Sequence, residues 1–337
     1  MRLAALVVLL AVIFAGFLGG SSAFWVNHWF EQSSVTVTER ATVEIEKGNS
    51  FSDVTDQLVE RGILRESDAL KFKVIAQLQQ KTEDIKVGEY SFEGEVTPKE
   101  VLERIERGQR VIRYITLPEG KPVEAVWRKF GDAAKLKNDI EGLDYDGVLN
   151  RLELYFEASH LEGLFFPDTY SYLAGNSATS VLQRAHDKLY AVLQDAWDAR
   201  SEDVQVENIY ELLILASIIE RESGVSRDRK QISGVLHRRL GIDMLLQVDP
   251  TVIYGLGDAF DGDLKTKHMR MDHEYNTYVH KGLPPSPICM PSKDSILAAA
   301  NPQPGDAMYF VGRGDGTSQF SATLREHNQA VQKYQMK

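Results

Sequence analysis

Glu220 and Glu222 are the residues best placed for acid–base chemistry, because they end a stretch of apolar sequence. Residues 208–222 have the pattern of a buried helix and carry no charge from 212 to 219. A carboxyl group at the end of a buried helix is partly desolvated, and desolvation favours the protonated form that a general acid needs. The alternative is that both glutamates are solvated helix-end residues, or that one of them pairs with a nearby arginine. The helix alone favours this plainer interpretation.

Two later segments are rich in groups that bind sugars. Residues 246–255 place Gln247, Asp249 and Tyr254 around a proline turn, and residues 275–278 (YNTY) add an amide and two more phenol rings. Amides and hydroxyls hydrogen bond to the polar groups of a sugar, and aromatic rings stack on its apolar faces. Each tyrosine taken alone is more often a core residue. Together, and next to a candidate acid, these groups predict a polysaccharide-binding cleft.

The signatures of several other chemistries are missing from the sequence. It contains no H-E-x-x-H, no Walker loop, no G-x-S-x-G and no paired C-x-x-C, and its eight histidines are scattered. We therefore expect neither a metal nor a cofactor. The net charge of −11 argues against a nucleic-acid binder. Cys289 is the only cysteine, so no intramolecular disulfide forms, and residues 312–316 indicate a hairpin turn between two short strands.

The N-terminal segment predicts a single membrane anchor. Residues 3–26 carry no charge, which exceeds the roughly 20 residues that span a bilayer core, and Trp25 and Trp29 stand where an aromatic belt would lie. Arg2 marks the cytoplasmic end, so the remainder would be exported. The competing interpretation is a signal peptide cleaved near residues 21–23. We favour an uncleaved anchor over residues 1–30, which include the start of a polar stalk that runs from residue 27 to residue 40.

The rest of the chain predicts two domains and the α+β fold class. Residues 41–115 indicate a strand–helix–helix–strand unit, with helix caps at Ser50, Ser67 and Thr97. Its size and order resemble a LysM-like carbohydrate-binding module, and a plain spacer domain fits the pattern equally well. Residues 116–337 form one larger domain of mixed helices and strands that contains the candidate acid.

In the second domain the sequence resembles the MltG (YceG-like) family of endolytic murein transglycosylases. The matching segments are residues 161–170 (LEGLFFPDTY), 216–222 (ASIIERE), 247–255 (QVDPTVIYG), 275–278 (YNTY), 282–285 (GLPP) and 326–328 (EHN). Their order and spacing hold over most of residues 111–337. An N-terminal anchor followed by a LysM-like module is also the layout of this family.

The resemblance implies a set of site residues. Its catalytic glutamate, the first in the A-S-I-[IV]-E-x-E stretch, falls on Glu220, and Glu222 receives a supporting part. The expected substrate-binding residues are Gln247, Asp249, Tyr254, Asn276, Tyr278 and Glu162. One departure is that Ser318 stands where many members have a histidine, two residues before Phe320.

The resemblance also implies a reaction and a setting. The substrate would be peptidoglycan glycan strands, cut within the strand at the β-1,4 bond between N-acetylmuramic acid and N-acetylglucosamine to leave 1,6-anhydromuramic ends. The enzyme would terminate nascent strands beside penicillin-binding synthases, anchored in the bacterial inner membrane with its catalytic domain in the periplasm. Two alternatives stay open: a hydrolytic muramidase with Asp249 or Glu162 as base, and a non-catalytic peptidoglycan-binding scaffold.

Overall fold

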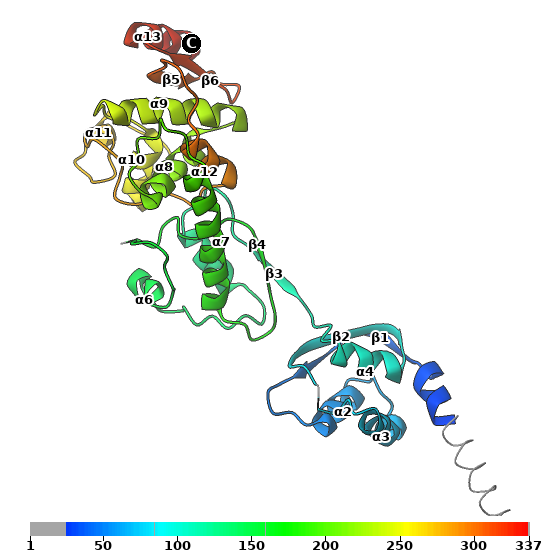
Figure 1. Cartoon of the computed structure of the whole chain (residues 1–337). Coiled ribbons are helices and arrows are strands. Elements are labelled where there is room, and N and C mark those ends of the chain that lie inside the picture. The colour runs from blue at the N-terminus through cyan, green and yellow to red at the C-terminus, as the bar shows by residue number, and fades with distance from the viewer. Residues whose placement is uncertain (1–24, 84, 159, 336–337) are drawn as a thin grey trace, which may run out of the picture. The chain divides into compact units, whose positions relative to one another are not determined.

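The chain folds into two compact units, each with its own core. The computed structural model describes residues 25–83, 85–158 and 160–335 (Figure 1). The first unit runs to Arg113 and takes in Leu173–Gly175, and the second contains Tyr114–Tyr172 and the remainder from Asn176. The mixture of helices and short strand pairs agrees with the predicted α+β class.

The first unit has the predicted order of strand, helix, helix and strand. Its elements are β1 (Val35–Ile45), α2 (Phe51–Glu60), η1 (Glu66–Asp68), α3 (Ala69–Leu78), β2 (Gly88–Val96) and α4 (Pro98–Glu106). β1 and β2 pair antiparallel, and α2 and α3 lie side by side (Figure 1). The likeness to a LysM module stays a prediction.

Of the three predicted helix caps of this unit, Ser50 and Thr97 are confirmed, and Ser67 is wrong because it lies within η1, so that α3 begins after Asp68. Ser50 accepts a hydrogen bond from the backbone of Asp53, whose carboxylate accepts one in return, and Thr97 and Glu100 make the same reciprocal pair. A capping box of this kind satisfies two backbone N–H groups that the helix leaves unpaired. Local sequence is therefore sufficient to start α2 and α4.

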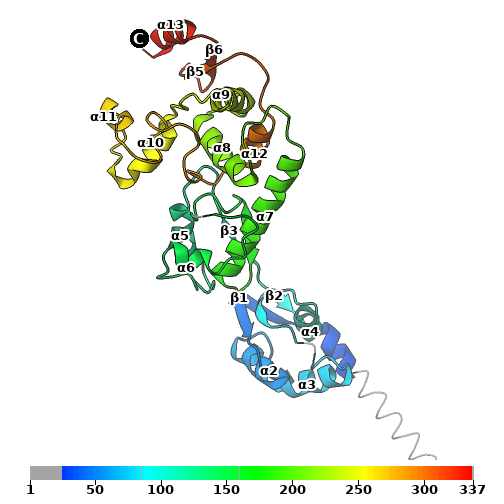
Figure 2. The same cartoon turned by 60° about the vertical axis from the view of Figure 1, so that its left-hand side comes forward.

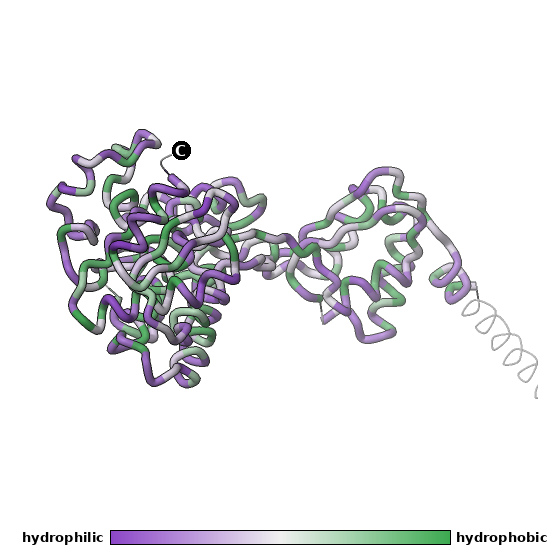
Figure 3. The backbone as a smooth tube through the Cα atoms, turned by 90° about the horizontal axis from the view of Figure 1, so that it is seen from above, coloured by the Kyte–Doolittle hydropathy of each residue, from purple (hydrophilic) through white to green (hydrophobic). Residues whose placement is uncertain are grey.

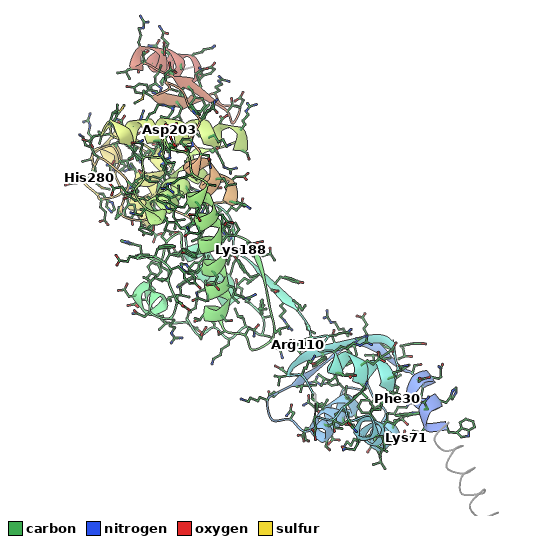
Figure 4. All side chains as sticks on the ribbon, viewed as in Figure 1. Phe30, Lys71, Arg110, Lys188, Asp203 and His280 are labelled. Atoms are coloured by element: carbon green, nitrogen blue, oxygen red, sulfur yellow. The ribbon has the colours of Figure 1, made fainter. Side chains whose placement is uncertain are left out.

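The prediction of a polar stalk over residues 27–40 is wrong. Residues 25–32 are helical, and Val35 already begins β1. The Phe30 side chain is 4% exposed and belongs to the core of the first unit, while Nζ of Lys71 on α3 lies 5.1 Å from the centroid of the Trp29 ring (Phe30 and Lys71 are labelled in Figure 4). Apolar burial by Phe30 draws this segment into the folded unit.

The expected membrane anchor falls mainly on residues 1–24, which lie outside the described residues. Among the helices that are described, none has both the length and the apolar character to cross a bilayer.

The second unit is built largely from helices, with two short strand pairs. Its elements, with β3 starting at the boundary, are β3 (Arg113–Thr116), α5 (Glu124–Gly131), α6 (Tyr145–Leu149), β4 (Thr169–Tyr172), α7 (Ala178–Asp198), α8 (Ile209–Glu222), η2 (Ser226–Asp228), α9 (Arg229–Gly241), α10 (Asp249–Leu256), η3 (Gly257–Ala259), α11 (Thr266–Met269), α12 (Lys293–Ala300), β5 (Tyr309–Gly312), β6 (Ser318–Ser321) and α13 (Leu324–Tyr334). β3 pairs with β4, and β5 pairs with β6. The turn at residues 312–316 joins β5 and β6 as an antiparallel hairpin, as predicted.

Helix α8 lies at the centre of the second unit. Every residue from Leu212 to Ile219 is buried, and α7, α9, α10 and α12 all pack against the helix. Figures 1 and 2 show α8 bordered by α9 and α12 from two directions. In Figure 3, hydrophobic and hydrophilic residues are interleaved along the backbone of both units, as expected where most helices bury one face only. α8 is the exception, because every residue from Leu212 to Ile219 is buried, whichever side of the helix it lies on.

One buried hydroxyl fixes α8 against the segment that precedes α12. Oγ of Ser217 donates to the carbonyl of Ile214 at 2.7 Å and accepts from the backbone N–H of Ile288 at 3.0 Å. Sγ of Cys289 donates to the carbonyl of Ser217 at 3.4 Å. These contacts set the position of α8 along its own axis, and with it the positions of the glutamates that end the helix.

We predict that Ser217→Ala lowers the free energy of unfolding of the second unit by about 1–3 kcal/mol, because the buried N–H of Ile288 loses its acceptor. Urea denaturation of the full chain measures the change. The control is Ser171→Ala on β4, where the side chain is exposed and a change within about 0.5 kcal/mol is expected. Equal, small effects at the two positions would contradict the role given to Ser217.

Candidate active site

A polar cavity of about 410 Å³ lies where the end of α8 meets the start of α10. α9, β5 and α13 complete its walls. The lining residues are Glu222, Arg239, Gln247, Asp249, Tyr278, Tyr309, Phe310, Val311, Gly312, Leu324, His327, Val331 and Gln335. The cavity therefore brings together four of the residues that the sequence analysis singled out, namely Glu222, Gln247, Asp249 and Tyr278.

Glu222 is the last residue of α8, and its side chain is half-buried in the wall of this cavity. Burial, together with the negative charge of Asp249, raises the pKa of Glu222 to about 8, and the positive charge of Arg239 opposes both. A carboxyl group with this pKa is largely protonated at neutral pH, which is the state that a general acid requires.

The two cleft-forming segments predicted from the sequence are joined through Thr277. Its carbonyl accepts from the backbone N–H of Gln247 at 3.0 Å, and its Oγ1 accepts from the backbone N–H of Val248 at 3.1 Å. The hydroxyls of Thr277 and Thr251 also lie 2.9 Å apart. Gln247 has a φ of +52°, a left-handed conformation that is uncommon outside glycine. The exposed Gln247 side chain is thus presented at the cavity by a backbone held in place from residue 277.

Asp249 and Tyr278 form a hydrogen-bonded pair in the lining of the cavity. The Tyr278 hydroxyl donates to Oδ1 of Asp249 at 2.6 Å. Asn276, by contrast, is 1% exposed: its side-chain N–H groups donate to the carbonyls of His268 and Met271, and its Oδ1 accepts from the backbone of Tyr278. The structure therefore gives Asn276 the task of shaping the turn that carries Tyr278. Its predicted contact with substrate finds no support in this geometry.

Glu220 lies elsewhere, because two residues of helix turn its side chain by roughly 200° from that of Glu222. Its Oε2 accepts hydrogen bonds from the backbone N–H of Ser292 at 3.0 Å, from the Ser292 hydroxyl, and from the Ser295 hydroxyl at 2.7 Å. Its Oε1 lies 3.5 Å from Nη2 of Arg229. Glu220 does not line the cavity that holds Asp249 and Tyr278.

The contacts of Glu220 are those of a structural tie. Ser292 is the N-cap of α12, and the carboxylate joins that cap to the end of α8. The neighbouring Arg221 donates to the carbonyl of Gly120 at 3.0 Å, which links the same helix end to the loop before α5. The expectation that Glu220 is the acid does not agree with this arrangement, since its oxygens are occupied by protein donors.

Sequence reasoning missed a second group of side chains that line the cavity. Arg239 on α9, Tyr309 on β5 and His327 on α13 stand there together: Cζ of Arg239 lies 5.2 Å from the centroid of the Tyr309 ring, and the rings of Tyr309 and His327 stack with their centroids 5.3 Å apart. The E-H-N segment pointed toward His327 without giving it a role. Nothing in the pattern of α9 distinguished Arg239 from its neighbours.

Glu162 and Tyr254 line a second cavity, of about 390 Å³. Glu162 is 4% exposed and accepts from the backbone N–H groups of Val123 and Gly163 and from the Tyr254 hydroxyl. Burial raises its pKa to about 7, although these hydrogen bonds act in the opposite direction. Glu162 thus ties the start of α5 to α10, and the binding of substrate by Glu162 and Tyr254 stays a prediction.

Two further expectations concern Ser318 and metals. The backbone N–H of Ser318 donates to Oδ2 of Asp228 at 2.6 Å, and Ser318 is not among the residues that line the first cavity. In the part of the chain that the structure describes, no three His, Cys, Asp or Glu side chains gather as metal ligands.

Comparison with known proteins decides the family. The model of the YceG-like family matches residues 43–333, which is most of the chain. The protein belongs to the YceG-like family. The family recognised from the sequence motifs is thereby confirmed, and the cavity around Glu222 lies within the matched residues.

Relatives of this YceG-like protein carry enzyme names. An endolytic murein transglycosylase of Bacillus subtilis is 28% identical over 307 residues, covering 87% of this chain and 84% of the relative. An endolytic murein transglycosylase of Streptococcus pneumoniae is 26% identical over 326 residues, and there the alignment covers 86% of this chain but only 57% of the longer relative. A crystal structure of a YceG-like protein from Listeria monocytogenes superposes with a TM-score of 0.52 at 29% identity, over 86% of this chain and 98% of that one.

The raised pKa values predict how stability depends on pH. Because the folded protein binds protons at Glu222 and Glu162 more tightly than an ordinary glutamate does, the free energy of unfolding falls as pH rises from about 4.5 toward 7 and 8. Each group contributes at most about 1.4 kcal/mol per pH unit to this loss.

Denaturation of Glu222→Gln across this range should show a shallower decline in the free energy of unfolding than the wild type. The exposed Glu207→Gln control should keep the wild-type slope, and equal slopes for all three proteins would contradict the burial of Glu222.

Proposed function

We propose that this protein is a peptidoglycan lytic transglycosylase that cuts within glycan strands and uses Glu222 as its acid and base. Membership of the YceG-like family and the enzyme names of two relatives support the reaction class. The observation that carries the proposal is a half-buried carboxyl group, with a pKa raised to about 8, in a cavity lined by amide, phenol and guanidinium groups.

The geometry favours Glu222 over Glu220 for the acid role. A general acid must present its proton to the substrate, and Glu222 lines the cavity with Gln247, Asp249 and Tyr278. Glu220 accepts hydrogen bonds from two serines and lies beside Arg229. We therefore move the acid from the first glutamate of the A-S-I-I-E-R-E stretch to the second, and we assign Glu220 the task of holding α8 against α12.

In the first step, protonated Glu222 gives its proton to the glycosidic oxygen between N-acetylmuramic acid and N-acetylglucosamine. The bond from C1 of the muramic residue to that oxygen breaks, and positive charge develops at C1. The anionic Asp249, held by the Tyr278 hydroxyl, favours protonated Glu222 beforehand and stabilises positive charge in the cavity. The departing strand leaves with a new hydroxyl group.

In the second step, the C6 hydroxyl of the same muramic residue attacks C1 and forms the 1,6-anhydro ring. Glu222, now a carboxylate, takes the proton of that hydroxyl and returns to its starting state. Arg239 stabilises the carboxylate form between the two steps. Because the substrate supplies the nucleophile, one carboxyl group serves both steps. The reaction therefore needs neither a water molecule nor a second catalytic carboxylate.

A hydrolytic muramidase is the second candidate, because Asp249 shares the cavity with Glu222. Ordinary glycosidases place two carboxyl groups on either side of the scissile bond. The products distinguish the two reactions, since a hydrolase leaves reducing ends where a transglycosylase leaves anhydro ends. The bond between Asp249 and Tyr278 favours the transglycosylase, because it occupies one oxygen that would otherwise orient a water molecule.

The setting of the enzyme is part of the same proposal. The uncharged run of residues 3–26 supports a single membrane anchor with the two units outside the bacterial inner membrane. An enzyme anchored there and cutting inside strands would act on newly made glycan, which would terminate elongation next to penicillin-binding synthases. Carbohydrate binding by the first unit would give the enzyme a second point of attachment to its substrate.

We predict that Glu222→Gln reduces the release of anhydro-ended fragments by about 100- to 10,000-fold, the usual contribution of acid–base catalysis. Glu220→Gln should keep measurable activity while lowering stability, because it weakens the tie to Ser292 and Arg229. The full chain in detergent is incubated with purified peptidoglycan, and the fragments are analysed by mass spectrometry.

The reverse pattern would return the acid role to Glu220. Reducing ends in place of anhydro ends would identify a muramidase. Sacculi that bind the folded wild type and yield no new fragments would identify a non-catalytic scaffold.

The pH profile tests the electrostatics of the cavity. Activity should fall as pH rises through about 8, because Glu222 loses the proton that it must donate. Since the charge of Asp249 raises the pKa of Glu222, the alkaline limb of Asp249→Asn should move to lower pH. If the alkaline limb of the Asp249→Asn activity profile stays at the wild-type pH, that limb reports the titration of a group other than Glu222.

A further inference from the structure

Arg239 is a buried cation fixed by backbone carbonyls. Its side chain belongs to a residue only 6% exposed, its Nε donates to the carbonyl of Met308 at 2.8 Å, and its Nη1 donates to the carbonyls of Leu245 and Leu246 at 3.3 and 2.6 Å. The Tyr309 ring packs beside the guanidinium. The side chain is therefore held in one orientation by groups from three parts of the unit.

In the described residues no carboxylate forms an ion pair with Arg239. The acidic side chain whose charge acts on it is Glu222, which is largely protonated at neutral pH. The hydrogen bonds of Arg239 to the described chain come from Nε and Nη1, which leaves Nη2 as the remaining donor. A buried charge without a partner is costly, and an arginine that is kept in such a place commonly meets an anion that arrives with a ligand. Arg239 lines the same cavity as Asp249, so such a ligand would bind within that cavity.

We propose that Arg239 forms an anion subsite that binds a carboxylate of the glycan strand through Nη2. This inference rests on the proposed function, because it takes the strand to be the occupant of the cavity. A carboxylate suits a guanidinium in geometry and charge, and the two N–H groups on Nη2 are the donors that remain. The subsite orients the muramic residue, the one sugar of the pair that carries an acidic substituent, so that its glycosidic oxygen faces Glu222.

The carboxylate has two sources in the polymer. In strands without peptide stems it is the free lactyl group of muramic acid, and in strands with stems it belongs to the peptide. Both present the same chemistry to Arg239. The experiment therefore uses both kinds of strand, each in its natural form and in a form whose carboxylates have been converted to neutral methylamides.

Binding is measured by fluorescence anisotropy of labelled strands on the full-length Glu222→Gln protein in detergent, so that no strand is cut. We expect methylamidation to weaken binding by roughly 10- to 100-fold in at least one strand type, the range of a charged hydrogen bond. Discrimination in stem-free strands identifies the lactyl carboxylate. Discrimination confined to stem-bearing strands identifies a stem carboxylate.

Arg238 supplies the matched control. It also holds the segment before β5, donating to the carbonyls of Ala307 and Gln303 at 2.8 and 3.2 Å, but it lines a different cavity. In the Glu222→Gln background, Arg239→Gln should bind natural and methylamidated strands alike, whereas Arg238→Gln should keep the preference. Equal binding of natural and methylamidated strands by the parent protein would overturn the proposal.

Binding and cleavage report on different claims. If strands with carboxylates bind more tightly through Arg239 but the wild type releases no anhydro ends, the subsite is supported and the proposed reaction is contradicted. If the wild type releases anhydro ends and shows no preference for strands with carboxylates, the reaction is supported and the subsite is contradicted.

Discussion

The arrangement of the site depends on the position in which α8 is buried. The helix is buried on all sides from Leu212 to Ile219, and the hydrogen bonds of Ser217 and Glu220 fix it to residues 288–295. Once Glu220 is bound to the cap of α12, helix geometry places Glu222 on the far side, in the cavity wall. The contact between Glu220 and the cap of α12 therefore sets which of the two glutamates lines the cavity.

The cavity around Glu222 balances opposite charges. Burial and Asp249 favour the protonated carboxyl group, and Arg239 favours the carboxylate. A group that must donate a proton and then recover one works best when neither state is strongly preferred at the working pH. Tyr278 holds Asp249 in place, and Thr277 holds the backbone beside Gln247, which has a left-handed conformation. The balance of charges therefore depends on α8, α9, the start of α10 and the segment that carries residues 277 and 278.

Local features of the fold could be predicted from the sequence, and long-range contacts could not. The capping boxes at Ser50 and Thr97 and the apolar run of α8 act within a few residues, so the sequence indicates them directly. The choice between Glu220 and Glu222 depends on Ser292, which lies 72 residues away, and no local pattern contains it. Arg239 was missed for the same reason, because its role follows from Tyr309 and the carbonyls that surround it. The segment expected to be a stalk is part of a folded unit because Phe30 is buried. The hydropathy of the segment alone did not indicate this burial.

The role of Glu222 as proton donor is tested most directly by measuring its protonation state. Carbon-13 NMR of the full chain labelled at glutamate carboxyl groups, with Glu222→Gln to assign the resonance, gives the pKa of this one group. We expect a titration midpoint near 8, far above that of an ordinary glutamate. A midpoint near the usual value of 4.5 would mean that Glu222 is a carboxylate at neutral pH, and it could not then be the proton donor.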